Sequence, residues 1–217
     1  MQLDQPHAGA TESTDECLSL LRQAQTGDFS AFGQLINQLQ HRVYGLAYRM
    51  LGETHDAEDI TQQTFLSLIE HLDSFRGESR VSTWVMRIAA NHALKLLRKR
   101  RGLPVEPSGG MPHPEFIAPW REQPGVLAEQ AETSKLIHEA LREINSGLRE
   151  VFVLRDIEGF SVKESAELLG ISEANVKVRL LRARLSLRER LTAVLGDQAL
   201  RVIPDHQHHA ANTGYAS

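Results

Sequence analysis

The chain has 217 residues and a net charge of −4, with 41% hydrophobic and 24% charged residues. This length suits one large or two small domains, and this balance excludes a wholly disordered protein. No apolar run reaches the roughly 18 residues of a membrane-spanning helix, and the first residues do not resemble a secretory signal. The single cysteine, Cys17, excludes an intrachain disulfide and a cysteine-based zinc site. A reducing cytoplasm is therefore the expected compartment, with no insertion into a membrane.

The charge is unevenly distributed along the chain. Residues 51–73 contain acids but no Lys or Arg, whereas residues 76–101 and 171–190 are strongly basic. This separation favours two surfaces that contact a polyanion and one surface that contacts a protein partner. Three solvated faces would produce the same pattern, so this alternative stays open.

Helical periodicity dominates the N-terminal half. Residues 1 to about 15 are predicted to be disordered. Ser30 is predicted to cap a helix whose apolar residues recur at helical spacing as far as Met50. A second apolar stripe runs from Ala57 to Leu72, and a third helix follows the loop "DSFRGES".

A change of composition then marks a linker. Six of the eight prolines lie between Pro104 and Pro124, with glycines around them. Helical periodicity resumes near Leu127 and continues to about Leu195, and we find no strand alternation and no internal repeat. We therefore predict an all-α protein with two small helical domains. The predicted segments are an N-terminal extension (1–24), a helical bundle (25–101), the linker (102–126), a second helical domain (127–195) and a disordered polar tail (196–217).

Residues 159–191 have the turn chemistry of a helix-turn-helix motif. Ser161 and Glu164 form a capping-box pattern, Gly170 ends the short helix, and Ser172 can cap the next one. An ordinary helical hairpin would have the same turn chemistry and remains an alternative.

The second helix of this motif favours DNA over simple packing. Its predicted buried stripe consists of Val176, Leu180, Ala183 and Leu187. The remaining surface mixes Lys, Arg and aliphatic side chains, which suits base edges and thymine methyl groups in a major groove, with phosphates binding the other cations.

The stretch "SRVSTWVMRIAANHALKLLRKRR" (79–101) predicts a helix with a basic stripe. An apolar stripe on the opposite side consists of Val81, Val85, Ile88 and Leu96. Trp84 lies at the edge of the polar stripe, and a basic stripe with an aromatic residue suits a nucleic-acid strand. A membrane-surface helix is disfavoured because the preceding helices have matching apolar stripes. A core position for Trp84 stays open as an alternative.

The acidic helix has no catalytic partner residues in its sequence. Its carboxylates and amides lie outside the apolar stripe, and no His, Ser or Cys is spaced to complete a site with them. We therefore predict a solvated or protein-binding face, no enzyme activity, no cofactor and no metal site. The tail histidines His206, His208 and His209 lack a predicted scaffold.

Three segments together resemble a bacterial extracytoplasmic-function (ECF) RNA polymerase sigma factor, of the group related to the envelope-stress sigma factor. These are "DAEDITQQTFL", "FRGESRVSTWVMRIAANHALKLLRKRR" and "LREVFVLRDIEGFSVKESAELLGISEANVKVRLLRARLSLRERL". The resemblance covers about residues 25–101 and 127–192. It implies a transcription initiation factor whose partners are core RNA polymerase (β′ and β subunits), promoter DNA and an anti-sigma factor. It also implies a linker that is threaded through the RNA exit path of the polymerase.

The resemblance also implies a role for each matching position. Residues implied to dock on β′ are Asp56, Glu58, Asp59, Gln62 and Gln63. Residues implied to contact the minus-ten element are Arg76, Ser79, Arg80, Ser82, Thr83, Trp84, Arg87, Asn91, Lys95, Arg98, Lys99 and Arg100. Residues implied to contact the minus-thirty-five element are Arg155, Lys177, Val178, Arg179, Leu181 and Arg182.

Two of these positions depart from the family pattern. Lys95 occupies a position where many members carry Asp or Asn, and Val178 one where a relative has a small polar residue. A stand-alone helix-turn-helix regulator is the main alternative to a sigma factor, and an adaptor that binds only protein is a weaker one. Binding to core polymerase would separate the first alternative from a sigma factor.

Overall fold

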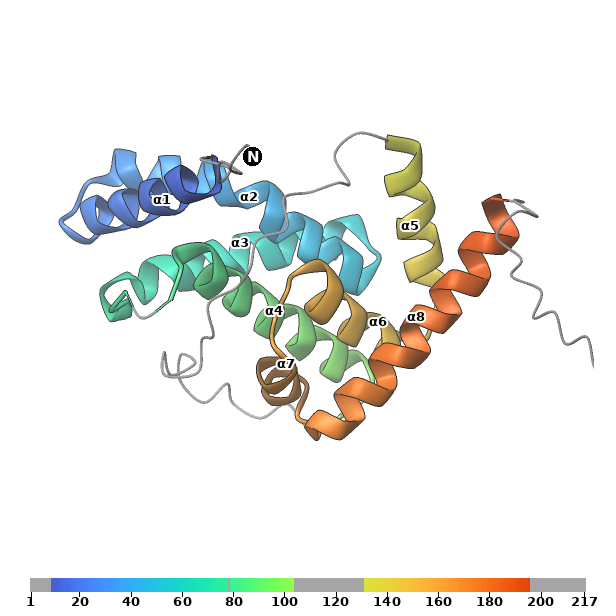
Figure 1. Ribbon diagram of the computed structural model, residues 1–217. Helices are drawn as coiled ribbons and strands as arrows, with labels where there is room; N and C mark the ends of the chain where they lie inside the picture. Colours follow the sequence, from blue (N-terminus) through green and yellow to red (C-terminus); the bar gives the residue numbers. More distant parts are fainter. Residues whose placement is uncertain (1–8, 78, 104–130, 196–217) are drawn as a thin grey trace, which may run out of the picture.

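The computed structural model describes residues 9–77, 79–103 and 131–195 of the chain, and these residues contain helices and no strand (Figure 1). The prediction of an all-α fold is confirmed. The elements in chain order are α1 (Gly9–Gln25), α2 (Phe29–Leu51), α3 (Thr54–Glu70), η1 (Leu72–Ser74), α4 (Val81–Arg100), α5 (Ala131–Glu143), α6 (Ser146–Phe152), the π-helical turn η3 (Val153–Ile157), α7 (Val162–Leu169) and α8 (Glu173–Leu195). Most of the predicted linker, the predicted tail and its histidines lie outside the described residues.

The N-terminal bundle is built from α1 to α4. Its core contains the predicted stripes, and Leu35, Val43, Leu46 and Met50 on α2 are fully buried. Helix α1 was not predicted. The expected disorder up to about residue 15 is wrong, because the helix begins at Gly9. This helix packs on α2 and α4 and buries apolar side chains, namely Cys17, Leu20, Leu21 and Ala24.

The start of α2 differs from the prediction by two residues. Asp28, not Ser30, is the N-cap, and its Oδ1 accepts hydrogen bonds from the backbone amides of Ser30 and Ala31 at 2.8 and 3.1 Å. A carboxylate satisfies two of the free amides at the helix start and favours the positive end of the helix dipole. Ser30 therefore lies inside the first turn.

Helix α4 is buried around most of its circumference, which the predicted single apolar stripe did not anticipate. Val81, Val85 and Ile88 are buried as predicted, but Arg87 on the predicted polar stripe and Trp84 at its edge are buried as well. The reason is tertiary: α4 contacts α1, α2 and α3, and α7 from the C-terminal half of the chain covers a further side.

The helix-turn-helix prediction is confirmed in detail. Ser161 Oγ accepts from the amide of Glu164 at 3.2 Å, and the Glu164 carboxylate accepts from the amide of Ser161 at 2.7 Å. Gly170 ends α7 with φ +66°, and Ser172 Oγ accepts from the amide of Asn175 at 3.2 Å at the start of α8. The predicted buried stripe of α8, Val176, Leu180, Ala183 and Leu187, is buried.

Replacing Ser161 by alanine is expected to lower the free energy of unfolding by about 1 kcal/mol, because the amide of Glu164 loses its acceptor at a helix start. Urea unfolding followed by circular dichroism measures this loss. Ser186→Ala, in the interior of α8, is the control and should change stability by less than about 0.5 kcal/mol. Equal effects of the two substitutions would contradict a capping role for Ser161.

The N-terminal and C-terminal halves share a hydrophobic core. Val153, Leu154, Phe160 and Leu168 belong to the same buried cluster as the side chains of α1 to α4. Helix α7 packs on α4, while α5, α6 and η3 contact α2 (Figure 1). Within the described parts of the chain, no helix is both long and apolar enough to cross a bilayer.

Candidate nucleic-acid interface

Helix α8 presents an exposed face of mixed cationic and aliphatic side chains. Val178 and Leu181 are 48% and 60% exposed, and Lys177 and Arg182 are exposed beside them. Arg179 is half-buried, and its Nε donates to Asn175 Oδ1 at 3.1 Å. The buried stripe directs this face outward, so the predicted DNA-contacting positions of α8 lie together on the surface.

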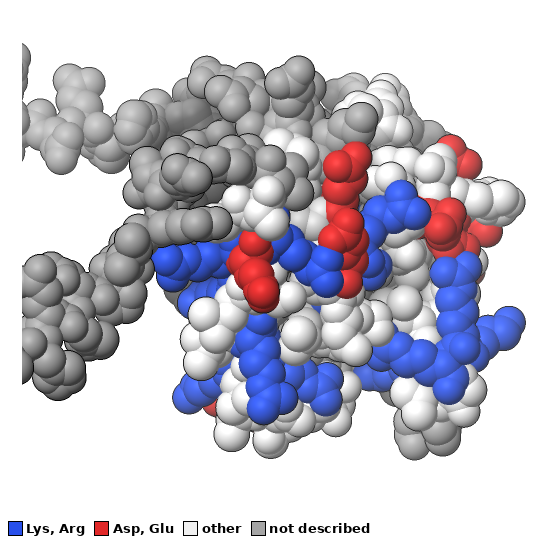
Figure 2. All heavy atoms as spheres, turned by 90° about the vertical axis from the view of Figure 1, so that its right-hand side faces the viewer, with Lys and Arg blue, Asp and Glu red and all other residues white. Residues whose placement is uncertain are grey.

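Figure 2 shows the side of the molecule that lies to the right in Figure 1. Lys and Arg side chains extend across this side, and its lower half contains almost no Asp or Glu. On α8, Arg184 donates two hydrogen bonds of 2.7 Å to the carboxylate of Asp156, and these bonds raise the pKa of Arg184. Arg155 lies half-buried next to Asp156 on η3.

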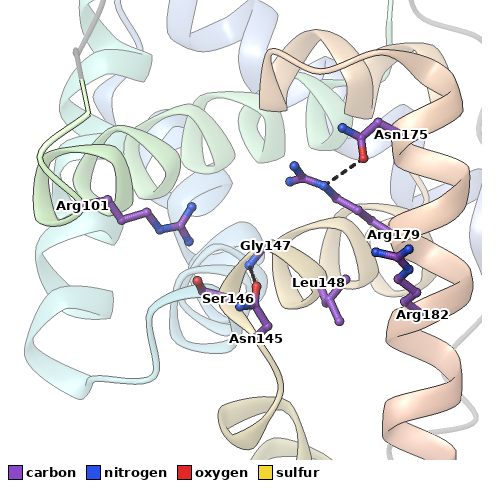
Figure 3. Close-up of a pocket in the computed structure, with 8 residues that line it drawn as sticks. All are labelled: Arg101, Asn145, Ser146, Gly147, Leu148, Asn175, Arg179 and Arg182. Carbon is purple, nitrogen blue, oxygen red and sulfur yellow. Dashed lines mark hydrogen bonds between the residues drawn. The ribbon is translucent and has the colours of Figure 1, made fainter.

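An open pocket of about 620 Å³ lies between α8 and the start of α6 (Figure 3). Its lining residues are Arg101, Asn145, Ser146, Gly147, Leu148, Asn175, Arg179 and Arg182. The lining holds three guanidinium groups and no carboxylate; that of Arg101 already pairs with Glu150, and those of Arg179 and Arg182 suit an anion such as a phosphate. Arg101 reaches the pocket from the end of α4, and the sequence reasoning missed it although it completes the basic run 98–101.

The cations of α4 differ in whether an acceptor within the chain already binds them. Lys95 and Lys99 are exposed, whereas Arg87 donates to Glu167 Oε2 at 3.0 Å and Arg98 donates to the carbonyl of Leu168 at 2.8 Å. Arg100 donates to Asp56 Oδ1 at 2.6 Å. Three of the cations assigned to DNA are therefore bound to acceptors within the chain in this structure.

Trp84 is a core residue in this structure. Its side chain is 5% exposed, and its ring packs on Phe75 with centroids 5.0 Å apart and planes tilted by 46°. The alternative that Trp84 packs beneath the polar stripe therefore describes its position. Among the other residues assigned to the minus-ten element, Arg76 is exposed, and Ser79, Arg80, Ser82, Thr83 and Asn91 are half-buried.

The acidic face of α3 is largely free of packing contacts with other helices. Glu58, Asp59, Gln62 and Gln63 are exposed, whereas Asp56 is half-buried beside Arg100. Farther along α3, Leu66 and Ile69 are 54% and 44% exposed. Neither side chain belongs to the predicted apolar stripe between Ala57 and Leu72. Their helical positions outside that stripe could therefore have predicted their exposure.

Two histidines on or near α3 have shifted pKa values. A backbone hydrogen bond and then the Asp59 carboxylate raise the pKa of His55, which lies 3.3 Å from Asp59. Burial and then the charge of Lys95 lower the pKa of His92, whose Nε2 lies 3.0 Å from Ser67 Oγ. Among the described residues, no three His, Cys, Asp or Glu side chains are grouped to hold a metal ion.

Two family models match the two helical halves. The model of sigma-70 region 2 matches residues 35–102, and that of sigma-70 region 4 matches residues 134–187. The ECF RNA polymerase sigma factor SigW of Bacillus subtilis is 34% identical over 181 residues, covering 79% of this chain and 94% of SigW. This chain belongs to the ECF RNA polymerase sigma factor family. It is an alternative sigma factor that directs transcription initiation.

Further relatives and solved structures of sigma factors are similar along most of their length. The RNA polymerase sigma-H factor of Pseudomonas aeruginosa is 28% identical over 190 residues, covering 85% of this sigma factor and 97% of its relative. The structure of CnrH in complex with the cytosolic domain of CnrY has a TM-score of 0.51 at 29% identity and covers 82% and 98% of the two chains. The sigma factor RpoE of Bartonella quintana, in complex with the anti-sigma factor NepR, has a TM-score of 0.52 at 24% identity, with coverage of 74% and 96%. This last similarity concerns the fold alone.

Proposed function

We propose that this sigma factor uses three separate surfaces: α3 binds core polymerase, the region around α4 binds the opened minus-ten element, and α8 binds the minus-thirty-five element. Two units of the chain carry these surfaces. Residues 25–101 carry the first two and residues 127–195 carry the third, with the linker at 102–126 between the units. The observation that carries the proposal is the exposed face of α8, where Lys177, Arg182 and two aliphatic side chains lie over a buried stripe.

On α3 the docking surface consists of Asp56, Glu58, Asp59, Gln62 and Gln63. Four of these five side chains are exposed, and the segment around them contains no Lys or Arg. Such a surface complements a basic patch, and complementary charge gives specificity and a fast association rate. We assign this contact to the β′ subunit and a further contact of the C-terminal half to the β subunit.

On α4 and the loop before it, the exposed residues Arg76, Lys95 and Lys99 are suited to the phosphates of a single strand. Trp84 supports this surface from the core, because its ring packs on Phe75 of the same loop. Unstacking a base costs a few kcal/mol, so the protein must hold the opened strand by many contacts at once. The work of this sigma factor is then binding alone, with no chemical step and no cofactor.

On α8 we assign base contacts to Lys177, Val178, Leu181 and Arg182, and phosphate contacts to the pocket that includes Arg179. The pocket is lined by arginines and by the start of α6. Their guanidinium and amide groups can donate hydrogen bonds to the phosphates of a DNA backbone. Arg155 serves as a further backbone contact. A chain with a net charge of −4 is expected to bind DNA weakly alone, so the polymerase must supply more contacts.

We also propose an anti-sigma partner and a cytoplasmic location. The solved relative CnrH, which is 29% identical to this chain, forms a complex with the cytosolic domain of CnrY. Promoter DNA and core polymerase are found in the bacterial cytoplasm, which is where a sigma factor acts.

Run-off transcription with core polymerase on a panel of promoters tests the proposed function. Specific initiation that requires the added chain is the expected result. No initiation on any promoter, together with tight and specific binding of duplex DNA by the isolated chain, would favour a stand-alone regulator instead.

Replacing Arg182 by alanine is expected to cost about 1–3 kcal/mol in promoter recognition, because a guanidinium that contacts a base or phosphate of the minus-thirty-five element is lost. Run-off transcription from promoters with and without that element measures the effect. Arg188→Ala removes the same charge from an exposed position farther along α8 and is the control. A similar loss for both variants would indicate general electrostatic attraction instead of recognition by Arg182.

A further inference from the structure

Helix α1 ends against the loop that precedes α4, and both lie at the left of Figure 1. We name residues 72–77 of this loop the minus-ten loop, because the proposed function places Arg76 against the opened minus-ten strand. Gln25, the last residue of α1, donates from Nε2 to the carbonyls of Leu72 at 2.8 Å and Phe75 at 3.3 Å. One side-chain amide therefore joins the start of η1 to its C-cap, across 47 and 50 residues of chain.

The hydrogen bonds within the minus-ten loop are local. The amide and Oγ of Ser74 donate to the carbonyl of His71 at 2.9 and 2.6 Å. The amide of Phe75 donates to the carbonyl of Leu72 at 3.4 Å. In the described part of the chain, neither His71, the N-cap of η1, nor Arg80, the N-cap of α4, makes a capping hydrogen bond with its side chain. Fixing a loop in one conformation costs backbone entropy, so a tie to a packed helix narrows the conformations that the loop samples.

A second side chain of α1 reaches the far end of the minus-ten loop. Arg22 lies three residues before Gln25 and therefore on the same side of the helix. A Cβ added to Gly77 would lie 3.7 Å from Nη2 of Arg22, so this guanidinium passes close to the glycine. Gly77 has φ +82°, a conformation that glycine adopts without strain. One face of α1 thus contacts both ends of the loop.

The donor of these bonds stands on a firm base. Leu21 and Ala24 of α1 are buried in the core of the N-terminal bundle. The turn to α2 is short, and the amide of Asp28 donates to the carbonyl of Gln23 at 3.1 Å before Asp28 caps α2. Gln25 is itself half-buried. A side chain held in this way can set the geometry of a functional loop, because packing already restricts its rotamers.

We propose that Gln25 is a positioning residue for the minus-ten loop, which it holds in the conformation that receives the opened strand without touching DNA itself. This inference rests on the proposed role of the loop and α4. It assigns a function to α1, which ends before residue 35, where the match to sigma-70 region 2 begins. The loop carries Arg76 next to Phe75, whose ring packs on Trp84 of α4. A preorganised loop loses less freedom when it binds a flexible strand, so it binds that strand more tightly.

The first test replaces Gln25 by methionine in the full chain. Methionine is similar in length and favours helices, but it cannot donate a hydrogen bond. The control is Gln23→Met, which makes the same substitution at an exposed position whose amide donates to Ser19 Oγ at 3.2 Å within α1. Hydrogen exchange followed by mass spectrometry measures how often the minus-ten loop opens. Circular dichroism checks that both variants keep their helices.

In the Gln25→Met variant, the amides of the minus-ten loop should exchange about fivefold faster, while those of α2 and α4 keep the parental rates. The Gln23→Met variant should exchange like the parent throughout. Parental exchange of the loop in Gln25→Met would overturn the tie, as would faster exchange spread evenly over the whole bundle.

The second test uses holoenzyme assembled from core polymerase and each variant. Run-off transcripts are compared from a promoter that is active in the promoter panel and from the same promoter with its minus-ten element replaced. Gln25→Met should lower the ratio of the two transcripts by about fivefold, because a loosened loop loses affinity for the correct strand and little for the wrong one. Gln23→Met should keep the parental ratio.

The two tests together separate this inference from the proposed function. A Gln25→Met variant with a loosened loop and the parental ratio would overturn the positioning role, even if total transcription falls. A parent chain that transcribes both templates equally would overturn the proposed minus-ten contact itself. Parental loop exchange in Gln25→Met, with a parent that distinguishes the templates, would overturn the inference alone.

Discussion

Replacing Trp84 by alanine is expected to lower the free energy of unfolding by about 3–5 kcal/mol, the range for truncating a large buried aromatic side chain. The ring is 5% exposed and packs on Phe75, so its removal leaves a cavity between α4 and the loop before it. This loss is a large fraction of the roughly 5–15 kcal/mol by which a typical domain is stable. Urea unfolding of the full chain, followed by circular dichroism, measures it.

Phe29 provides a matched control for this prediction. It is an aromatic residue at the start of α2 that is 81% exposed, so Phe29→Ala should change stability by less than about 0.5 kcal/mol. A Trp84→Ala variant as stable as the parent but unable to open a promoter would contradict the core role and favour direct contact with the opened strand.

Reversing two charges on α3, by Glu58→Lys with Asp59→Lys, is expected to weaken binding to core polymerase by about 3 kcal/mol or more, which is over a hundredfold. Both side chains are exposed, so the fold should tolerate the change. The large effect arises because each new lysine replaces an attraction to a basic partner by a repulsion. Titration of labelled sigma factor with core polymerase measures the dissociation constant.

The control for this effect lies on the same segment. Glu70→Lys with Asp73→Lys makes the same change in charge at exposed positions, with Glu70 about 18 Å along the helix from Glu58. Binding should then change by less than about threefold, or roughly 0.6 kcal/mol. Equal weakening by both pairs would show that the attraction is diffuse and would remove the assignment of a local docking surface to Glu58 and Asp59.

Local chemistry was predictable from the sequence wherever neighbouring residues complete it. The capping box of Ser161 and Glu164 and the turn at Gly170 involve residues close in sequence, and both occur in the structure as predicted. The prediction failed at Ser30, because Asp28 two residues earlier is the stronger acceptor for the same amides. It also failed for α1, because we read a polar terminus as disordered although its later residues have an apolar face.

The surroundings of α4 were predictable only in part. A helical wheel separates residues of one helix into two sides, but it contains no information on how many other helices cover them. Trp84 lies at the polar edge of that wheel and Arg87 on its polar side, and both are nevertheless buried, because Trp84 packs on Phe75 and Arg87 pairs with Glu167 of α7. For the same reason the sequence could not reveal that Arg87, Arg98 and Arg100 are bound to acceptors in the chain.

The sequence by itself determined the helical class, the buried stripe of α8 and the outward direction of Lys177, Leu181 and Arg182, because apolar periodicity and capping act within a few residues. The tertiary structure alone decided which of the cations assigned to DNA are bound to acceptors within the chain and which are exposed. Arg87 and Glu167 are 80 residues apart in the chain, and Arg49 and Glu158 are 109 apart. Such pairs form only when the two halves share a core, and the local pattern around either partner is the same whether or not they do.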